Sequence, residues 1–231
     1  MKKKSDEKLK IIPLGGLEQI GMNITAFECQ DSIVLVDCGL AFPEDDMLGV
    51  DLVIPDVTYL LENADKVKGL CITHGHEDHI GAIPYILKQI NMPIYATKLT
   101  NGLIENKLKE HGMLRTVKRK VVKYGQSINL GCFRIEFIKT NHSIQDAAAL
   151  ALFSPAGIVV HTGDFKVDYT PVFGDAIDLQ RFGEIGKKGV LALLCESTNA
   201  ERSGFTPSEK TVGRVFDNLF SEYSDTRIII A

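Results

Sequence analysis

The sequence predicts a layered α/β protein, in which two β-sheets pack against each other and helices cover their outer faces. Short apolar, β-prone runs alternate with segments whose apolar residues recur at helical spacing. No internal repeat or low-complexity stretch interrupts this alternation. A chain of 231 residues can bury roughly 70% of its unfolded surface, which suffices for one large domain or for one domain and part of a second.

The first half of the chain contains most of the expected strands. The predicted elements are, in order, strands over 10–13, 23–29 and 32–37, a long loop over 42–59, a strand over 69–73, a helix over 80–90, and strands near 94, 121 and 158. Gln30 and Asp31 join the second and third strands in a hairpin. The loop is rich in Asp, Pro and Gly and longer than most connections, which favours a functional role.

The last forty residues indicate a change of domain. Residues 190–195 form an apolar strand and 201–205 a polar linker, after which Thr206-Pro207-Ser208-Glu209 reads as a capping box that opens a helix to about Tyr223. Residues 227–231 begin another apolar strand. Because ending inside such a strand is physically odd, we expect a fragment with a basic tail over 1–8, a first domain over 9–195 and the start of a second over 196–231.

A dense cluster of metal-ligand side chains follows the strand over 69–73. Residues 74–79 read His-Gly-His-Glu-Asp-His, so that His74 and His76 lie in an extended loop and Asp78 and His79 open the next helix. Imidazole nitrogens and carboxylate oxygens suit zinc, with manganese or iron also possible, and four donors this close can serve two ions. Ordinary loop histidines are the alternative, but each residue type here matches a coordination requirement.

Three more candidates follow strand-like runs, namely Asp37, His142 and Asp164. Chemistry gathers at strand ends in layered α/β folds, because the strands are rigid and the loops beyond them vary. Five of the six histidines lie in or beside these motifs, and only His111 reads as an exposed helix end. For Asp37 the alternative is a turn residue after a strand.

Composition restricts the location and the partners. No apolar run has the 18 or more residues of a membrane helix, and the Lys-rich start lacks a signal peptide's apolar stretch, so we expect a cytoplasmic protein without membrane contact. The five cysteines show no paired spacing, which favours reduced core thiols, with Cys38 the one candidate near the site.

The net charge of −4 argues against indiscriminate nucleic-acid binding but permits a local basic groove. Residues 107–123 hold seven basic side chains and one acid, which makes them a candidate surface for phosphate contacts, with a solvated face as the equal alternative. The seven are Lys107, Lys109, Arg115, Lys118, Arg119, Lys120 and Lys123. Lys2 to Lys4 are expected to form a disordered tail.

The succession of Asp37, His74-x-His76-x-Asp78-His79, His142 and Asp164 resembles the signature motifs of the metallo-β-lactamase superfamily. Residues 14–23 (Leu-Gly-Gly-Leu-Glu-Gln-Ile-Gly-Met-Asn), the loop 42–56 and residues 195–199 (Cys-Glu-Ser-Thr-Asn) resemble the bacterial ribonuclease J family of the β-CASP branch. The glycine-rich loop at 15–21 lacks the Gly-Lys-Ser/Thr ending of a P-loop, so we expect it to shape a tight turn beside the metals.

The resemblance implies an αββα sandwich, present in part, and the start of an inserted β-CASP domain. It implies two zinc ions, with manganese possible. His74, His76 and His142 would hold one ion, and Asp78, His79 and Asp164 the other, with Asp164 bridging both. The implied catalytic group is Asp37, Asp78 and Glu196: Asp37 would orient a ligand imidazole or the nucleophile, and Glu196, at the acidic position of β-CASP motif A, would orient a histidine or a phosphate.

The activity implied is hydrolysis of single-stranded RNA by a hydroxide shared between two metals, as endonuclease and 5′–3′ exonuclease in rRNA maturation and mRNA decay. The full-length protein would form a homo-oligomer and have RNA-degradation partners. Family members add a ligand histidine and phosphate-binding residues after the part matched here, so we expect the isolated chain to be poorly active. A small-molecule hydrolase of thioesters or lactams, or an inactive metal-binding fragment, are the alternatives.

Overall fold

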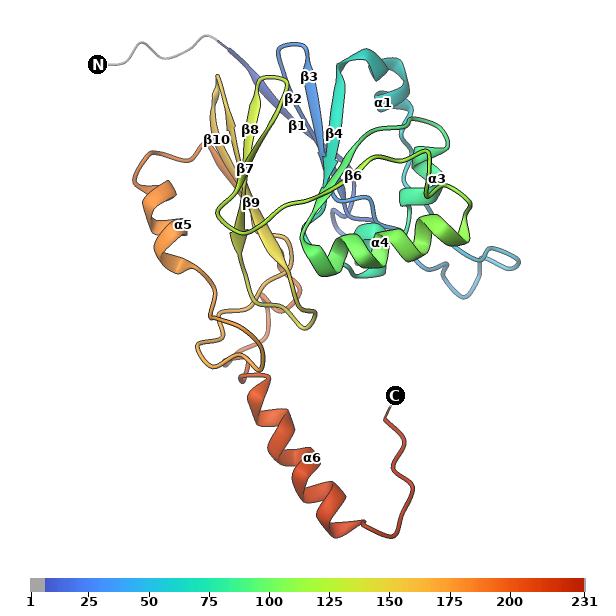
Figure 1. The fold of residues 1–231 in the computed structure, drawn as a ribbon, viewed down its shortest axis with the longest axis vertical. Helices are drawn as coiled ribbons and strands as arrows, with labels where there is room; N and C mark the ends of the chain where they lie inside the picture. The colour runs from blue at the N-terminus through green and yellow to red at the C-terminus, as the bar shows by residue number, and fades with distance from the viewer. Residues whose placement is uncertain (1–6, 231) are drawn as a thin grey trace.

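The structure is a computed structural model that describes residues 7–230, and its two β-sheets pack face to face with helices on both outer faces (Figure 1). In chain order the elements are β1 (Leu9–Gly15), β2 (Ile24–Cys29), β3 (Ser32–Val36), α1 (Thr58–Glu62), the 3₁₀ helix η1 (Ala64–Lys66), β4 (Val67–Cys71), α2 (Glu77–Ile80), α3 (Ile83–Leu87), β5 (Ile94–Ala96), α4 (Lys98–Glu110), β6 (Arg119–Val121), β7 (Ser127–Leu130), β8 (Phe133–Lys139), β9 (Ala148–Ser154), β10 (Gly157–His161), α5 (Leu179–Gly186), β11 (Ala192–Leu194) and α6 (Lys210–Glu222).

The strand directions bring several strand ends to the same edge. The first sheet has the order β1-β2-β3-β4-β5-β6, and β3 to β6 run parallel. The second has the order β11-β10-β9-β8-β7, in which β8 and β10 both run antiparallel to β9 and therefore parallel to each other. The hairpin predicted at Gln30 and Asp31 joins β2 to β3 and is confirmed.

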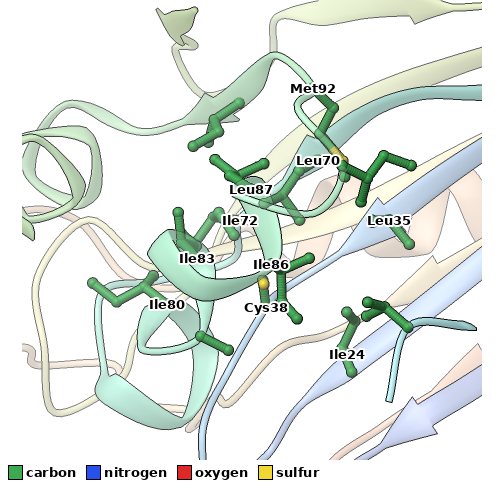
Figure 2. Packing of buried hydrophobic residues seen from close by; sticks show 14 of the residues in the cluster. Ile24, Leu35, Cys38, Leu70, Ile72, Ile80, Ile83, Ile86, Leu87 and Met92 are labelled. Carbon is green, nitrogen blue, oxygen red and sulfur yellow. The ribbon is translucent and has the colours of Figure 1, made fainter. Parts of the chain in front are cut away.

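Three apolar clusters separate the four layers. Phe27 from the first sheet meets Phe133 and Phe137 of the second in the cluster between the sheets. A second cluster fills the space between the first sheet and helices α3 and α4, as Figure 2 shows for Leu70, Ile83 and their neighbours. A third, smaller cluster lies between the second sheet and α5. Strands β2 and β3 are buried along their whole length because both of their faces are covered. The expected αββα sandwich is confirmed.

The continuous helix predicted over residues 80–90 is wrong in detail, because the segment forms two short helices, α2 and α3. Pro84 lies in the first turn of α3, and it has no backbone N–H with which to continue the hydrogen-bond ladder from α2. The N–H of Ala82 donates instead to Cys38 O at 3.0 Å, which ties the break to the segment after β3. The apolar spacing still buries Ile83 and Ile86.

The capping box predicted at residues 206–209 does not form. Helix α6 begins at Lys210, and its cap residue, Glu209, makes no side-chain cap hydrogen bond. In a capping box the Thr206 hydroxyl would accept from the Glu209 N–H, but this N–H donates to Asp168 Oδ2 at 3.1 Å, forty-one residues earlier in the chain. No residue of α6 is buried, and in Figure 1 the helix extends away from the sandwich.

The strand predicted over 227–231 is also wrong, because residues 227–230 have no regular secondary structure and Ala231 lies outside the described residues. A strand needs a neighbour for its backbone groups, and the structure pairs none with this segment. The tail at Lys2 to Lys4 lies outside the described residues. All five cysteines are free thiols, and Cys195 is exposed rather than buried. Among residues 7–230, no helix is long and apolar enough to cross a membrane.

Candidate metal centre

The six predicted ligands lie at the edge of the sandwich where β4, β8 and β10 end. Ligand atoms from five of them form two groups, and within each group all atoms lie within 4.8 Å of one another. We call His74, His76 and His142 the three-histidine group, and His74, His79 and Asp164 the mixed group. Because His74 belongs to both, the two groups adjoin.

The three-histidine group has the spacing of a tetrahedral metal site. His76 Nδ1 lies 3.1 Å from His74 Nε2 and 3.1 Å from His142 Nε2. With zinc–nitrogen distances of about 2.0–2.1 Å, tetrahedral coordination separates two ligand nitrogens by ~3.3 Å. The rings meet edge to face, with centroids 4.8–4.9 Å apart, so each nitrogen is free of stacking. The donor set therefore fits a metal ion.

Asp164 spans the two groups with its two carboxylate oxygens. Its Oδ1 lies 3.4 Å from His79 Nε2, and its Oδ2 lies 3.7 Å from His142 Nε2. This is the placement that a bridging carboxylate needs. Asp78 lies close by, with Oδ2 3.5 Å from His79 Nε2, although it is not part of the mixed group itself.

Asp37 and Thr73 fix the orientation of two ligand rings from behind. The buried Asp37 carboxylate accepts from the Thr73 N–H at 2.8 Å through Oδ1, and its Oδ2 lies 2.8 Å from His79 Nδ1. The Thr73 hydroxyl donates to Asp37 Oδ2 at 2.8 Å and lies 3.0 Å from His74 Nδ1. Because Nδ1 of both rings is engaged, Nε2 of both faces the site.

Close backbone packing holds the ligand-bearing helix α2 against the segment after β3. A Cβ atom on Gly39 would lie 1.5 Å from Asp78 O, so only glycine fits there. The adjacent Cys38 N–H donates to His79 O at 2.8 Å, and the thiol itself is buried, which raises its pKa. Cys38 therefore lies beside the site, as the sequence suggested, and it contacts the site through its backbone N–H rather than its thiol.

The glycine-rich loop after β1 reaches the same place. Gly16 has a φ of +82°, and a Cβ there would lie 2.7 Å from Asn23 Oδ1. Asn23 Nδ2 in turn lies 3.1 Å from His79 Nε2 and 3.3 Å from Asp78 Oδ2. The loop is thus a tight turn next to the ligand residues, and no backbone cradle for phosphate is needed to explain it.

The electrostatics favour the cation-binding form of the predicted ligands with resolved pKa shifts, except His79. Burial, reinforced by the neighbouring imidazoles, lowers the pKa of His74, and burial also lowers that of His142. Burial would lower the pKa of His79 too, but Asp37 and the other carboxylates outweigh it and raise this pKa well above its ordinary value. Burial would raise the pKa of Asp164, but the hydrogen bond and charge of His79 outweigh burial and lower it. The cluster thus combines neutral imidazoles at His74 and His142 with anionic oxygens, whereas the raised pKa of His79 favours its protonated form.

The remaining predicted residues lie further out. Glu196 accepts from the Thr198 N–H at 2.9 Å, and its charge opposes only slightly the lowering of the His142 pKa by burial. In the basic stretch, Lys107 pairs with Glu77 at 2.8 Å, and Arg119 is likewise engaged by an acid of α4. Part of the stretch is therefore neutralised by its own surroundings.

Sequence reasoning missed Thr73 and Asn23 as site residues. Thr73 directly precedes His74, and Asn23 ends the motif at 14–23, so their positions were visible. Their roles were not, because Thr73 acts through Asp37 and Asn23 through His79, both distant in the sequence.

Comparison with known proteins agrees with this geometry. Residues 23–178 match the family described as the metallo-beta-lactamase superfamily. The chain is 52% identical over 218 residues to ribonuclease J of Synechocystis, covering 94% of this chain and 34% of that protein. It is 46% identical over 228 residues to ribonuclease J of Helicobacter pylori (98% and 33%), and 44% identical over 232 residues to ribonuclease J2 of Bacillus subtilis (100% and 41%). The chain therefore spans about a third of the length of the relatives it matches.

Solved structures share the fold at low sequence identity. A protein of unknown function from Enterococcus faecalis superposes with a TM-score of 0.69 at 16% identity, covering 94% of this chain and 58% of that one. Zn(2+)-bound PqqB from Methylobacterium extorquens superposes with a TM-score of 0.56 at 10% identity, covering 87% and 78%. These likenesses show the fold, and the family match over residues 23–178, more than half of the chain, shows that the chain belongs to the metallo-beta-lactamase superfamily, with ribonuclease J among its relatives.

Proposed function

We propose that this chain carries the metal centre of a ribonuclease that hydrolyses phosphodiester bonds of single-stranded RNA. The observation that carries the proposal is the pair of adjoining ligand groups, which share His74 and have Asp164 between them. The similarity to proteins named ribonuclease J over nearly the whole chain supports RNA as the substrate.

The ions we propose are two zinc ions, with manganese as the alternative, because imidazole-rich sites suit zinc and carboxylates admit manganese. The three-histidine group would hold one ion. Asp78, His79 and Asp164 would hold the other, with Asp164 bridging. When bound, two such ions supply Lewis acidity at the phosphoryl group and a water nucleophile of lowered pKa.

The protein's own residues prepare the site in three ways. Asp37 and Thr73 hold the ligand rings so that Nε2 of each faces inward. The low pKa of His74 keeps its ring neutral at physiological pH, so that its nitrogen lone pair remains available. Glu196, which accepts from the Thr198 N–H, would orient His142 or a substrate phosphate. We assign Asp37, Asp78 and Glu196 to catalysis: Asp78 as a ligand of the second ion, and Asp37 and Glu196 as residues that orient other groups.

We also propose that residues 196–231 begin a second domain after the first over 9–195. The exposed character of α6 supports this, since a helix that buries none of its residues has no partner within residues 7–230. A small-molecule hydrolase of thioesters or lactams would share every ligand, but the relatives reported above do not favour it.

Two measurements on purified protein test the proposal. The first is the metal content per chain, for which we expect two ions in the wild type and a loss at both positions in Asp164→Asn. The second is cleavage of end-labelled single-stranded RNA beside hydrolysis of a thioester, using the 231-residue chain and a longer version carried to the end of the reading frame. Metal-dependent RNA cleavage by the longer version, abolished by Asp164→Asn, supports the proposal. Thioester hydrolysis without RNA cleavage contradicts it.

A further inference from the structure

A pocket of about 390 Å³ adjoins the candidate metal centre, and the proposed metal coordination leaves it unused. Its wall includes His142 but no other predicted ligand, and it is built mainly from residues 139–146, after β8, and residues 166–174, after Asp164. The volume falls within the range of about 300–1,000 Å³ for sites of small organic molecules. A molecule in this pocket would lie directly beside the three-histidine group.

The wall offers aromatic rings beside an ammonium group. Phe173 lines the pocket with 67% of its surface exposed, so its ring is not used to pack the protein. Tyr124, in the segment between β6 and β7, also lines the pocket, and Lys139 Nζ lies 5.8 Å from the centroid of the Tyr124 ring. Phe173 thus offers an exposed face on which a nucleobase can stack, and the Lys139 ammonium lies beside the second ring of the wall, Tyr124.

The charges of the wall do not favour a lone phosphate. Its carboxylates are each paired within the chain: Asp146 with the Tyr124 hydroxyl and the Leu99 N–H, Asp168 with Ser208 and the Thr170 N–H, and Glu209 with Lys166. Lys139 has a weaker partner in the exposed Asp175, at 3.4 Å. With acids and bases nearly balanced, the pocket suits a neutral polar ring better than an anion.

Two polar atoms of the wall residues have no hydrogen-bond partner among residues 7–230. They are Thr140 Oγ1 and Asn141 Oδ1, both buried. Asn141 Nδ2 donates to Asp175 O, so its Oδ1 remains as an acceptor. An unpaired buried polar atom destabilises the protein, and a ligand N–H or O–H would offset that cost. Both atoms lie under the pocket surface, so pairing with a ligand requires a rotation of the side chain.

We propose that this pocket binds one nucleoside unit of an RNA strand, its base on Phe173 and its donor groups toward Asn141 and Thr140, with the neighbouring phosphate at the metal centre. The inference rests on the proposed ribonuclease function and adds to it a specific position for a flanking nucleotide.

The test uses the 231-residue chain stripped of metal with a chelator, so that RNA is bound but not cut. Adenosine, uridine and inorganic phosphate are titrated separately into isotope-labelled protein, and amide resonances of residues 139–146 and 166–174 are followed by NMR. Binding of a fluorescent single-stranded RNA is then measured by anisotropy for the wild type and for Phe173→Ala. Phe205→Ala is the matched control, because Phe205 is fully exposed and does not line the pocket.

We expect the two nucleosides to shift the pocket resonances and phosphate to leave them unchanged. Phe173→Ala should weaken RNA binding about tenfold, the loss of one stacked base, whereas Phe205→Ala should bind like the wild type. Free nucleosides that bind while RNA affinity is insensitive to Phe173 would mean a mononucleotide site and overturn the strand assignment. RNA binding of wild-type strength in Phe173→Ala without nucleoside shifts refutes the pocket but leaves the ribonuclease proposal intact. Absence of RNA binding by the wild type refutes the pocket, and absence of RNA cleavage by the longer version refutes the function itself.

Discussion

Replacing Asp37 by Asn tests whether this carboxylate orients the ligand imidazole of His79. Asp37 has a φ of +61°, a conformation that Asn tolerates well, so the backbone should be retained. The carboxylate accepts from Thr73 and lies 2.8 Å from His79 Nδ1. An amide has one acceptor oxygen. If that oxygen keeps the Thr73 N–H, the NH₂ group faces His79 Nδ1 and shifts the ring proton to Nε2, the atom that should bind metal.

Losing such an orienting partner costs about 10–100-fold in metal affinity, or ~1.4–2.7 kcal/mol. We expect this loss at the mixed group and a smaller one at the three-histidine group, because Thr73 still contacts His74. Calorimetric titration of chelator-stripped protein with Mn²⁺ resolves the two sites. Asp178→Asn is the control, since Asp178 caps α5 and Asn caps a helix equally well. A folded Asp37→Asn protein that binds both ions with wild-type affinity would refute the reasoning.

Three further changes have defined outcomes. His76→Ala removes one nitrogen of the three-histidine group and should lower metal affinity at least tenfold; elemental analysis that finds unchanged metal would contradict the site. Gly39→Ala places a Cβ against Asp78 O and should lower the free energy of unfolding by ~1–3 kcal/mol and reduce the metal content. Gly102→Ala, whose Cβ meets nothing within 4 Å, should do neither. The contacts of Glu28 with Lys10 and Tyr59 lower its pKa from 4.5 to about 2. Its stabilisation, at most about 3 kcal/mol, is therefore present above pH 4.5 and lost as the pH falls toward 2; denaturation in chelator should show the gap between wild type and Glu28→Gln closing over that range, and a constant gap would disprove it.

Local patterns in the sequence predicted the candidate ligands and most of the strands. His74, His76 and His79 are close in the chain, so their joint role depends only on a short loop and one helical turn. The β2–β3 hairpin is likewise specified by the two residues between its strands. Apolar runs identified the core strands because burial on both faces requires continuous apolar sequence.

Tertiary structure decided which groups the ligands bond and where the helices begin. Asp37 meets His79 across forty-two positions, and Asp168 accepts from the Glu209 N–H across forty-one, which takes the amide that Thr206 should have capped. Asn23 reaches His79 across fifty-six positions, and the pocket beside His142 is formed by loops from different strands. A side chain with several possible partners takes the one that the packed sheets bring within about 3 Å, and that choice depends on long-range contacts that no local pattern encodes.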